Sequence, residues 1–286
     1  METNRNPIFA CIDGSAQQDA IVDYASWISH RSNTPLKFIH NLEARQTAHS
    51  DLSGNLGPGA REELLAELVE LENQRSKILL EQGKEMLESA CQRARQNGAV
   101  DITRQQRHGS LIESLIELEL EIGLLVIGLR GESRQEKQQK LGSHIRTVIR
   151  SLHKPILVIN KAFPQQEPQR CMFAYDSSDA SRNALDMITG TPVFAGLECH
   201  LVHVAKEKET PDLQQTAARL EHAGFKVTTI SLHGDVEARI LEYQKQNAID
   251  FTIMGAFGHS RIRELLFGNV IHRLLLESDT PVLLLR

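Results

Sequence analysis

Short runs of apolar residues alternate along the chain with longer stretches in which apolar residues recur at helical spacing. In the second half the short runs are rich in Val, Ile, Leu and Phe and show little alternation, which is typical of strands buried on both faces. We expect strands over 172–175, 201–204, 226–231, 251–254 and 282–285, and helices over 180–189, 212–223, 236–247 and 269–277. This alternation of strands and helices predicts right-handed crossovers and an open parallel sheet with helices on both faces, an α/β fold.

The same succession of landmarks occurs twice along the chain. Ile8–Ser15 resembles Cys171–Ser178, and Leu36–His40 resembles Cys199–His203, each pair lying 163 positions apart. Three later landmarks follow in the same order at spacings of 125 to 127: 108–109 with 233–234, 126–128 with 253–255, and 155–159 with 281–285. A repeat of this length predicts two tandem domains from one duplicated unit. We place them at 1–163 and 168–286, joined by a short linker with a proline at each end, Pro164 and Pro168.

The first copy carries about 38 additional residues between its second and third landmarks. Residues 41–60 are polar and glycine-containing, and 61–97 are expected to form a long helix. Its apolar residues form two stripes, Leu64, Leu68 and Leu71 first, then Leu79, Met86, Leu87, Ala90 and Ala94. The change of stripe near Arg75 indicates that the first half of the helix extends beyond the domain core. Two interpretations stay open: a longer crossover helix packed on its own sheet, or a lid or interdomain prop near the first site.

Composition narrows the class of protein. The 286 residues are 41% hydrophobic with a net charge of −5, so no basic field favours a nucleic-acid partner. The apolar run around residues 124–127 is far too short for a membrane span, and no signal peptide is evident. Four cysteines, none in a C-x-x-C pair, are expected to be small core residues of a reduced, cytoplasmic protein: Cys11, Cys91, Cys171 and Cys199.

The strongest local pattern is G-x2-G-x9-G-N, which starts at Gly255 after a predicted strand and leads into the last helix. Gly255 and Gly258 leave no Cβ in the way, so the backbone can close on an anion. Gly268 and Asn269 stand at the start of the helix, where free N–H groups and the positive end of the helix dipole favour phosphate oxygens. The pattern therefore predicts a phosphate site, and the alternative is an ordinary helix start preceded by turn glycines.

Segment 251–286 resembles the C-terminal motif of the universal stress protein family, G-x2-G-x9-G followed by Ser or Thr, with a Pro and an apolar run at the end. The resemblance covers both halves of the chain and is specific in the second. It implies that Asp176 holds the ribose or adenine end of a nucleotide, and that Val204 and Met254 line the adenine. It further implies that the phosphates meet Gly255, Gly258, His259, Gly268, Asn269 and Val270. Asn269 departs from the family's Ser or Thr but keeps a polar helix cap.

The first copy departs further from that motif, because its spacer is one residue longer and very polar. Arg130, Arg134 or Lys140 would add positive charge there. Two interpretations stay open: a second phosphate site, or a degenerate domain retained for pairing and regulation. The residues of the first-copy site would be Asp13, Ile127, Gly128, Gly131, Gly142 and Ser143.

No catalytic group stands out. His40 and His203 end equivalent strands and are expected to be structural, and neither a nucleophile elbow nor a Walker motif is present. The resemblance therefore implies a bacterial stress-response regulatory protein that binds ATP or a related adenine nucleotide, with or without Mg, and not an enzyme. The alternatives are a slow metal-dependent ATPase and a nucleotide-free interaction or dimerisation module. The resemblance also implies that the two domains of the chain pair with each other, with the terminal strands 156–159 and 282–285 meeting edge to edge. The expected partners are a second tandem chain and an unidentified protein.

Overall fold

The computed structural model describes residues 6–42, 58–129, 143–160, 162–164, 166–205, 213–256 and 269–286. For residues 58–65, 143, 144 and 269 it describes the backbone alone. All statements below on absence refer to this part of the chain.

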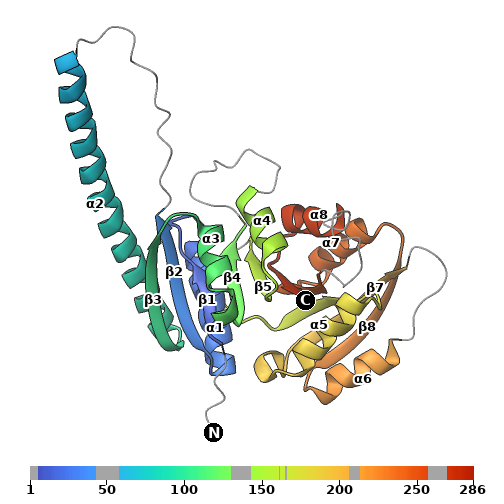
Figure 1. The fold of residues 1–286 in the computed structure, drawn as a ribbon. Helices are drawn as coiled ribbons and strands as arrows, with labels where there is room; N and C mark the ends of the chain where they lie inside the picture. The colour runs from blue at the N-terminus through green and yellow to red at the C-terminus, as the bar shows by residue number, and fades with distance from the viewer. Residues whose placement is uncertain are drawn as a thin grey trace.

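Each half of the chain forms five parallel strands connected by helices (Figure 1). The first half comprises β1 (Ile8–Cys11), α1 (Gln18–Ser32), β2 (Pro35–Leu42), α2 (Pro58–Gln96), β3 (Val100–His108), α3 (Leu111–Glu117), the 3-10 turn η1 (Glu119–Glu121), β4 (Leu124–Gly128), α4 (Ser143–Ser151) and β5 (Ile156–Ile159). The second half comprises β6 (Arg170–Ala174), α5 (Asp179–Thr189), η2 (Pro192–Phe194), β7 (Glu198–Ala205), α6 (Gln214–His222), β8 (Lys226–His233), α7 (Val236–Gln246), β9 (Phe251–Gly255), α8 (Asn269–Glu277) and β10 (Val282–Leu285). The predicted succession of strands and helices in the second half is confirmed.

The two half-sheets join into one ten-stranded sheet of order β3-β2-β1-β4-β5-β10-β9-β6-β7-β8. The junction is the antiparallel pair β5–β10, in which Leu157 lies opposite Leu283. The predicted edge-to-edge meeting of the terminal strands is therefore confirmed, within one chain. Since all other pairs are parallel, the carboxyl ends of the two half-sheets face opposite edges at this junction.

Helices cover both faces of the sheet, as predicted. Residues of α1, α2, α5 and α6 pack into one buried apolar cluster, and those of α3, α4, α7 and α8 into another. Strand residues alternate between the two clusters: Ile8 and Ala10 face the first, Phe9 and Cys11 the second. Each cluster contains residues of both halves, so the core is continuous across the β5–β10 junction.

The contact between the halves is aromatic on the face covered by α1. Trp27 of α1 lies 6.2 Å from Phe194 and 5.8 Å from Phe251, measured between ring centroids. Arg31 extends the contact, because its Nε and Nη2 donate to the carbonyl oxygens of Val193 and Ala195 at 2.6 and 2.5 Å. These contacts hold the halves in one fixed arrangement.

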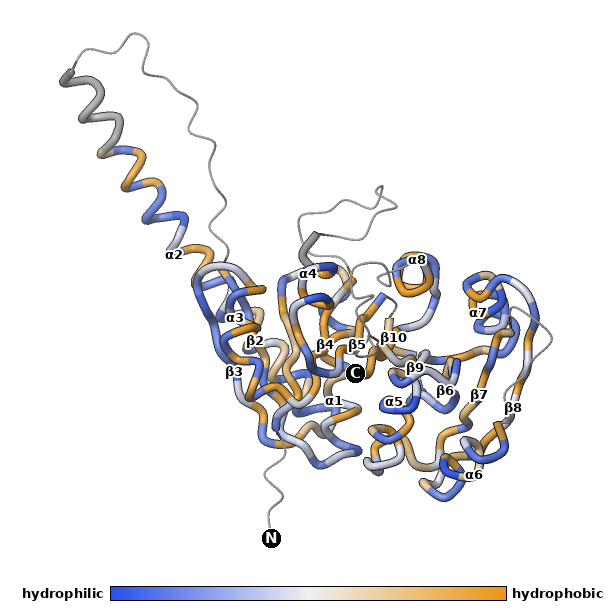
Figure 2. The backbone as a smooth tube through the Cα atoms, turned by 45° about the vertical axis from the view of Figure 1, so that its right-hand side comes forward, coloured by the Kyte–Doolittle hydropathy of each residue, from blue (hydrophilic) through white to orange (hydrophobic). Residues whose placement is uncertain are grey.

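The long helix α2 divides into two parts. Its C-terminal part is buried through Leu87, Ala90 and Ala94 against the first half-sheet, which confirms the interpretation as a crossover helix on its own sheet. Its N-terminal part projects beyond β3, away from the body of the molecule (Figures 1 and 2). Leu68, Leu71 and Ile78 are about half exposed there, at 46, 54 and 58%.

All four cysteines are buried core residues, as predicted, and all are free thiols. Burial, with a smaller contribution from the nearby Asp13 carboxylate, raises the pKa of Cys11 well above the usual thiol range. A hydrogen bond with Cys199, followed by burial, raises the pKa of Cys171. Thiols with raised pKa values are poor nucleophiles, which fits a structural role.

Candidate functional site

The order of the strands identifies where a ligand site is expected in each half. The chain order reverses between β6 and β9 in the second half, and between β1 and β4 in the first. In open parallel sheets, ligands bind beyond the carboxyl ends of the strands at such a switch point. Asp176 follows β6 directly, and Met254 and Gly255 end β9, so the structure brings these predicted residues to one switch point.

The turn after β6 presents Asp176 in a defined geometry. Its Oδ1 accepts the backbone N–H of Ser178 at 3.0 Å, and Ser177 between them has a left-handed φ of 62°. Ser178 then caps α5 by accepting the N–H of Ser181 at 3.2 Å. Burial of the turn acts to raise the pKa of Asp176, but hydrogen bonds from Ser178 and Ser181 outweigh burial and hold it below its usual value. Asp176 is therefore an ionised hydrogen-bond acceptor at the surface, the chemistry that a ribose hydroxyl or an amino group recognises.

The first half repeats this turn. Asp13 Oδ1 accepts the N–H of Ser15 at 3.0 Å, and the left-handed residue between them is Gly14, with φ 72°. A histidine supports each turn: Nδ1 of His40 lies 2.7 Å from the Ile12 carbonyl oxygen, and Nδ1 of His203 lies 2.8 Å from that of Tyr175. Because a carbonyl only accepts, Nδ1 carries the proton in both rings. The prediction that both histidines are structural is confirmed.

Gly255 is required by packing at the end of β9. A Cβ added there would lie 2.4 Å from the backbone carbonyl of Ala180 and 2.5 Å from the N–H nitrogen of Ser181. The end of β9 and the first turn of α5 are thus in direct contact, and any larger residue would separate them. This contact places the N-terminus of α5 beside the switch point. It gives Gly255 a structural reason to be glycine in addition to the phosphate contact predicted from the sequence.

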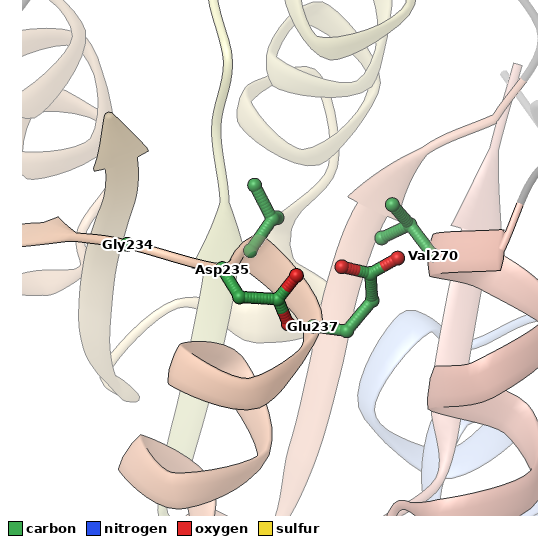
Figure 3. Close-up of a pocket in the computed structure, with 5 residues that line it drawn as sticks. Gly234, Asp235, Glu237 and Val270 are labelled. Atoms are coloured by element: carbon green, nitrogen blue, oxygen red, sulfur yellow. The ribbon is translucent and has the colours of Figure 1, made fainter. Parts of the chain in front are cut away.

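A hollow of about 400 Å³ opens in the second half between the β8–α7 loop and the start of α8 (Figure 3). Its walls are Gly234, Asp235, Val236, Glu237 and Val270. Of these the sequence predicted only Val270. The repeat landmark His233-Gly234 was a usable signal, because it marks a loop that follows a strand at the carboxyl edge of the sheet.

The walls of this hollow combine apolar and acidic groups. Val236 and Val270 pack against the large buried cluster to which Met254 belongs and against which Val204 also packs. Asp235 caps α7 by accepting the N–H of Ala238 at 3.0 Å, and in Figure 3 the carboxylate of Glu237 reaches toward Val270. Among the described residues that the sequence predicted for the second-half site, Val270 of α8 lines this hollow.

The position equivalent to Val204 in the first half is Asn41, which the sequence did not single out. Its Nδ2 donates to Ser114 Oγ at 2.7 Å and lies 3.4 Å from the carbonyl oxygens of Gly109 and Ser110. Its Oδ1 is buried without a hydrogen-bond partner. Where the second half has the apolar side chain of Val204, the first half therefore has a polar side chain that links β2 to α3 and the loop before it.

The remaining predicted residues are only partly described. Ile127 and Gly128 end β4 next to β1, so they lie at the switch point with Asp13. Asn269 and Ser143 begin α8 and α4, with the backbone alone described. Gly131, Gly142, Gly258, His259 and Gly268 lie outside the described residues.

Within the described residues, no group of three or more His, Cys, Asp or Glu side chains is arranged to hold a metal ion. None of the helices in the same ranges combines the length and apolarity needed to cross a bilayer.

Comparison with known proteins agrees with the fold and with the family resemblance. The model of the Universal stress protein family matches residues 4–160 and 197–286. Universal stress protein Slr1230 of Synechocystis sp. is 34% identical over 286 residues, covering 98% of this chain and 99% of its own length. A universal stress protein from Archaeoglobus fulgidus has a similar structure, with a TM-score of 0.75, 18% identity and 99% of both chains covered.

Two solved relatives carry adenine nucleotides. One is a universal stress protein in complex with cAMP, with a TM-score of 0.36, and the other is a family member from Arabidopsis thaliana with AMP bound, with a TM-score of 0.34. Likeness at this level does not carry a ligand over to this chain.

Proposed function

Because the chain belongs to the universal stress protein family, we propose that it is a cytoplasmic stress-response regulatory protein that binds an adenine nucleotide, ATP, chiefly in its second half. The observation that carries this proposal is the β6–β9 switch point, to which the structure brings Asp176, Met254 and Gly255. In the hollow of the same half, Val236 and Val270 suit a base, and the start of α8 at its rim suits phosphates.

We assign each part of the nucleotide to residues of the second half. Asp176 accepts from the ribose or adenine end, and Val204 and Met254 line the base. The phosphates meet Gly255, Gly258, His259 and Val270, with Gly268 and Asn269 at the start of α8. Two helix N-termini, those of α5 and α8, stabilise the negative charge of the phosphates.

We also propose that the chain acts as two structural units, 1–163 and 168–286. Each carries its own switch point and its own copy of the aspartate turn. The antiparallel β5–β10 pair and the aromatic contact around Trp27 then act as a permanent domain interface. The first unit, with Asp13, Ile127, Gly128, Gly131, Gly142 and Ser143, is in this proposal the weaker or silent site.

Binding without turnover is the favoured activity. Phosphoryl transfer needs a metal clamp and a residue that positions the attacking water. The carboxylates of Asp235 and Glu237 suit a Mg²⁺ ion that arrives with the nucleotide, since Mg²⁺ takes one or two carboxylates together with phosphate oxygens. Asp235 already caps α7, and its Oδ1 lies 3.8 Å from Nη1 of Arg273. A slow ATPase is the alternative.

The test is nucleotide content and binding. The purified chain is denatured, any released nucleotide is identified by chromatography and mass, and ATP binding is measured by calorimetry. Gly268→Val in the second half is compared with the matched Gly142→Val in the first. We expect one nucleotide per chain, abolished by Gly268→Val and retained by Gly142→Val.

Other outcomes would redirect the proposal. ATP binding that survives Gly268→Val would place the site elsewhere. Release of ADP in a Mg²⁺-dependent manner would favour the ATPase. A chain that holds no nucleotide and binds none would favour an interaction module.

A further inference from the structure

Buried polar atoms without a hydrogen-bond partner gather in the first half of the molecule. In the part of the chain that the structure describes there are four such side-chain atoms, and all belong to the first half: Ser15 Oγ, Trp27 Nε1, Asn41 Oδ1 and Asn160 Oδ1. Ser15 follows β1, Asn41 lies near the end of β2 and Asn160 follows β5, so three of the four stand at the carboxyl edge of the first half-sheet. A buried polar atom without a partner costs free energy, and this is the edge at which ligands bind to such sheets.

The equivalent positions of the second half are different. Ser178, the counterpart of Ser15, accepts the N–H of Ser181 at 3.2 Å, and Val204, the counterpart of Asn41, has an apolar side chain. The aspartate turn itself is the same in both halves. The unpartnered atoms are therefore specific to the first half and do not belong to the shared framework.

The amide of Asn41 is held in one orientation. Its Nδ2 lies 2.7 Å from Ser114 Oγ and 3.4 Å from the carbonyl oxygens of Gly109 and Ser110. Carbonyl oxygens only accept hydrogen bonds, so the NH₂ group faces them and Oδ1 is left as an acceptor. Ser114 is buried, which keeps this anchor in place. A group that completes Oδ1 must therefore bring an N–H or O–H donor.

The strand register puts Asn41 level with Asp13. Cys11 pairs with Ile39 across β1 and β2, and two residues further along the two strands are Asp13 and Asn41. Asp13 already accepts the N–H of Ser15 at 3.0 Å, but a carboxylate has about four acceptor positions and can accept more. Neighbouring strands lie about 4.8 Å apart, so both side chains can reach one edge of a ligand. The switch point of the first half thus presents two acceptors side by side.

We propose that the switch point of the first half binds a guanine nucleotide, with Asp13 and Asn41 accepting from N1–H and the 2-amino group of the base. These two donors are adjacent on one edge of guanine. Adenine presents a donor and an acceptor on that edge, its 6-amino group and N1, and so sets an acceptor against an acceptor. A site built to accept N–H groups rejects a base that lacks them, because its own polar atoms stay unpaired. This site is separate from the adenine site proposed for the second half and does not depend on it.

Calorimetry of the full chain with added nucleotide tests the base contacts through the ligand alone. Added nucleotide is used because a reversible site loses its ligand during purification. IDP keeps N1–H of GDP and lacks only the 2-amino group. We expect GDP to bind at least about tenfold more tightly than IDP, and excess ADP to leave bound GDP in place.

Asn41→Val places the residue of the second half in the first and removes the acceptor. We expect GDP affinity to fall at least about tenfold. The matched control is Asn73→Val, the same change at an exposed position of α2, which should bind GDP like wild type. Thermal denaturation of both variants checks that the fold is retained. ADP binding is measured on the same samples, so a failure of the second-half site is seen separately.

Three results would overturn the guanine site. They are a chain that binds no GDP, GDP binding that survives Asn41→Val, and equal affinities for GDP and IDP. A chain that binds ADP and no GDP would overturn this inference and leave the second-half proposal standing. If Asn41→Val does not fold, the comparison of GDP with IDP and ADP on the wild-type chain decides.

Discussion

The two halves of this molecule share one framework and differ in the surfaces around it. Both place an aspartate turn after the first strand, and both hold that turn with a histidine Nδ1–H bond of almost the same length, 2.7 Å in one half and 2.8 Å in the other. Around this framework, the position next to the histidine is Asn41 in the first half and Val204 in the second. The comparison teaches that the two copies keep the hydrogen bonds to the backbone that hold the turn, while the side chains beside the switch point differ.

The long helix marks a second difference between the halves. In the first half α2 lies over the aspartate turn, since a Cβ added to Gly14 would come within 3.0 Å of Met86 Sδ. The N-terminal part of α2 extends away from the body of the molecule (Figure 2). In the second half the short helix α6 takes the corresponding place in the chain. We therefore assign adenine-nucleotide binding chiefly to the second half.

The largest effect is expected from Gly255→Ala, which tests how tightly the second half is assembled. The added Cβ would lie 2.4 Å from the Ala180 backbone, so we expect a loss of about 1–3 kcal/mol in the free energy of unfolding. Urea denaturation measures it. Gly190→Ala is the control, because Gly190 has an ordinary φ of −80° and its nearest neighbour would be 3.1 Å away. Equal effects at both glycines would contradict the packing argument.

Exchange of Asn41 and Val204 tests whether these two positions cause the expected difference in ATP binding between the two halves. Val204→Asn puts an amide into an apolar wall, and an unsatisfied polar group there costs about 1–3 kcal/mol, so we expect ATP affinity to fall at least about tenfold. Asn41→Val should leave the amount of bound ATP unchanged. Calorimetry measures both variants, and a binding loss in Asn41→Val alone would reverse the assignment of the halves.

A smaller effect is expected from exchanging the left-handed residues of the two turns. Gly14→Ser adds a side chain at φ 72° and close to Met86, and should destabilise the protein by about 1 kcal/mol. Ser177→Gly relieves a φ of 62° and should stabilise it by less than about 1 kcal/mol, because glycine also gains freedom on unfolding. Thermal denaturation gives the signs, and shifts of the same sign would refute the shared turn geometry.

The smallest effect concerns acid pH and Asp176. Because its pKa is lowered in the folded protein, its contribution to stability is present above the usual carboxylate pKa of about 3.9 and is lost as pH falls through the lowered value. Asp176→Asn should therefore flatten the acid limb of the stability profile and leave its shape near neutral pH unchanged. The side chain is exposed, so the difference is small. Identical acid limbs would show that the Ser178 and Ser181 bonds contribute nothing.

Much of the fold was accessible from local patterns. Buried strands such as 251–255 and 282–285 are apolar on both faces, and the repeat of Ile8–Ser15 in Cys171–Ser178 established the duplication without any contact information. The G-x2-G-x9-G-N pattern directed attention to the start of α8, and the site residues assigned from it stay predictions.

Other features depend on contacts between segments far apart in the chain. The walls of the hollow at Gly234 and Glu237, and the bond from Asn41 to Ser114, join segments that no local pattern connects. The sequence pattern predicted that Gly255 contacts phosphate. Only the close approach of the Ala180 backbone to the position of an added Cβ shows that Gly255 also has a packing role.

The sequence by itself determined the helices and strands, their order and the presence of two copies. The reason is that burial of one or both faces leaves its own pattern of apolar residues in each short segment. Tertiary packing decided the antiparallel register in which β5 and β10 join the two copies into one sheet, and the extent to which the apolar stripe of α2 at Leu68 and Leu71 is exposed. The physical reason is that an apolar stripe in the sequence shows only which side of a helix is apolar. Which surface covers it depends on the direction in which the rest of the chain places the helix.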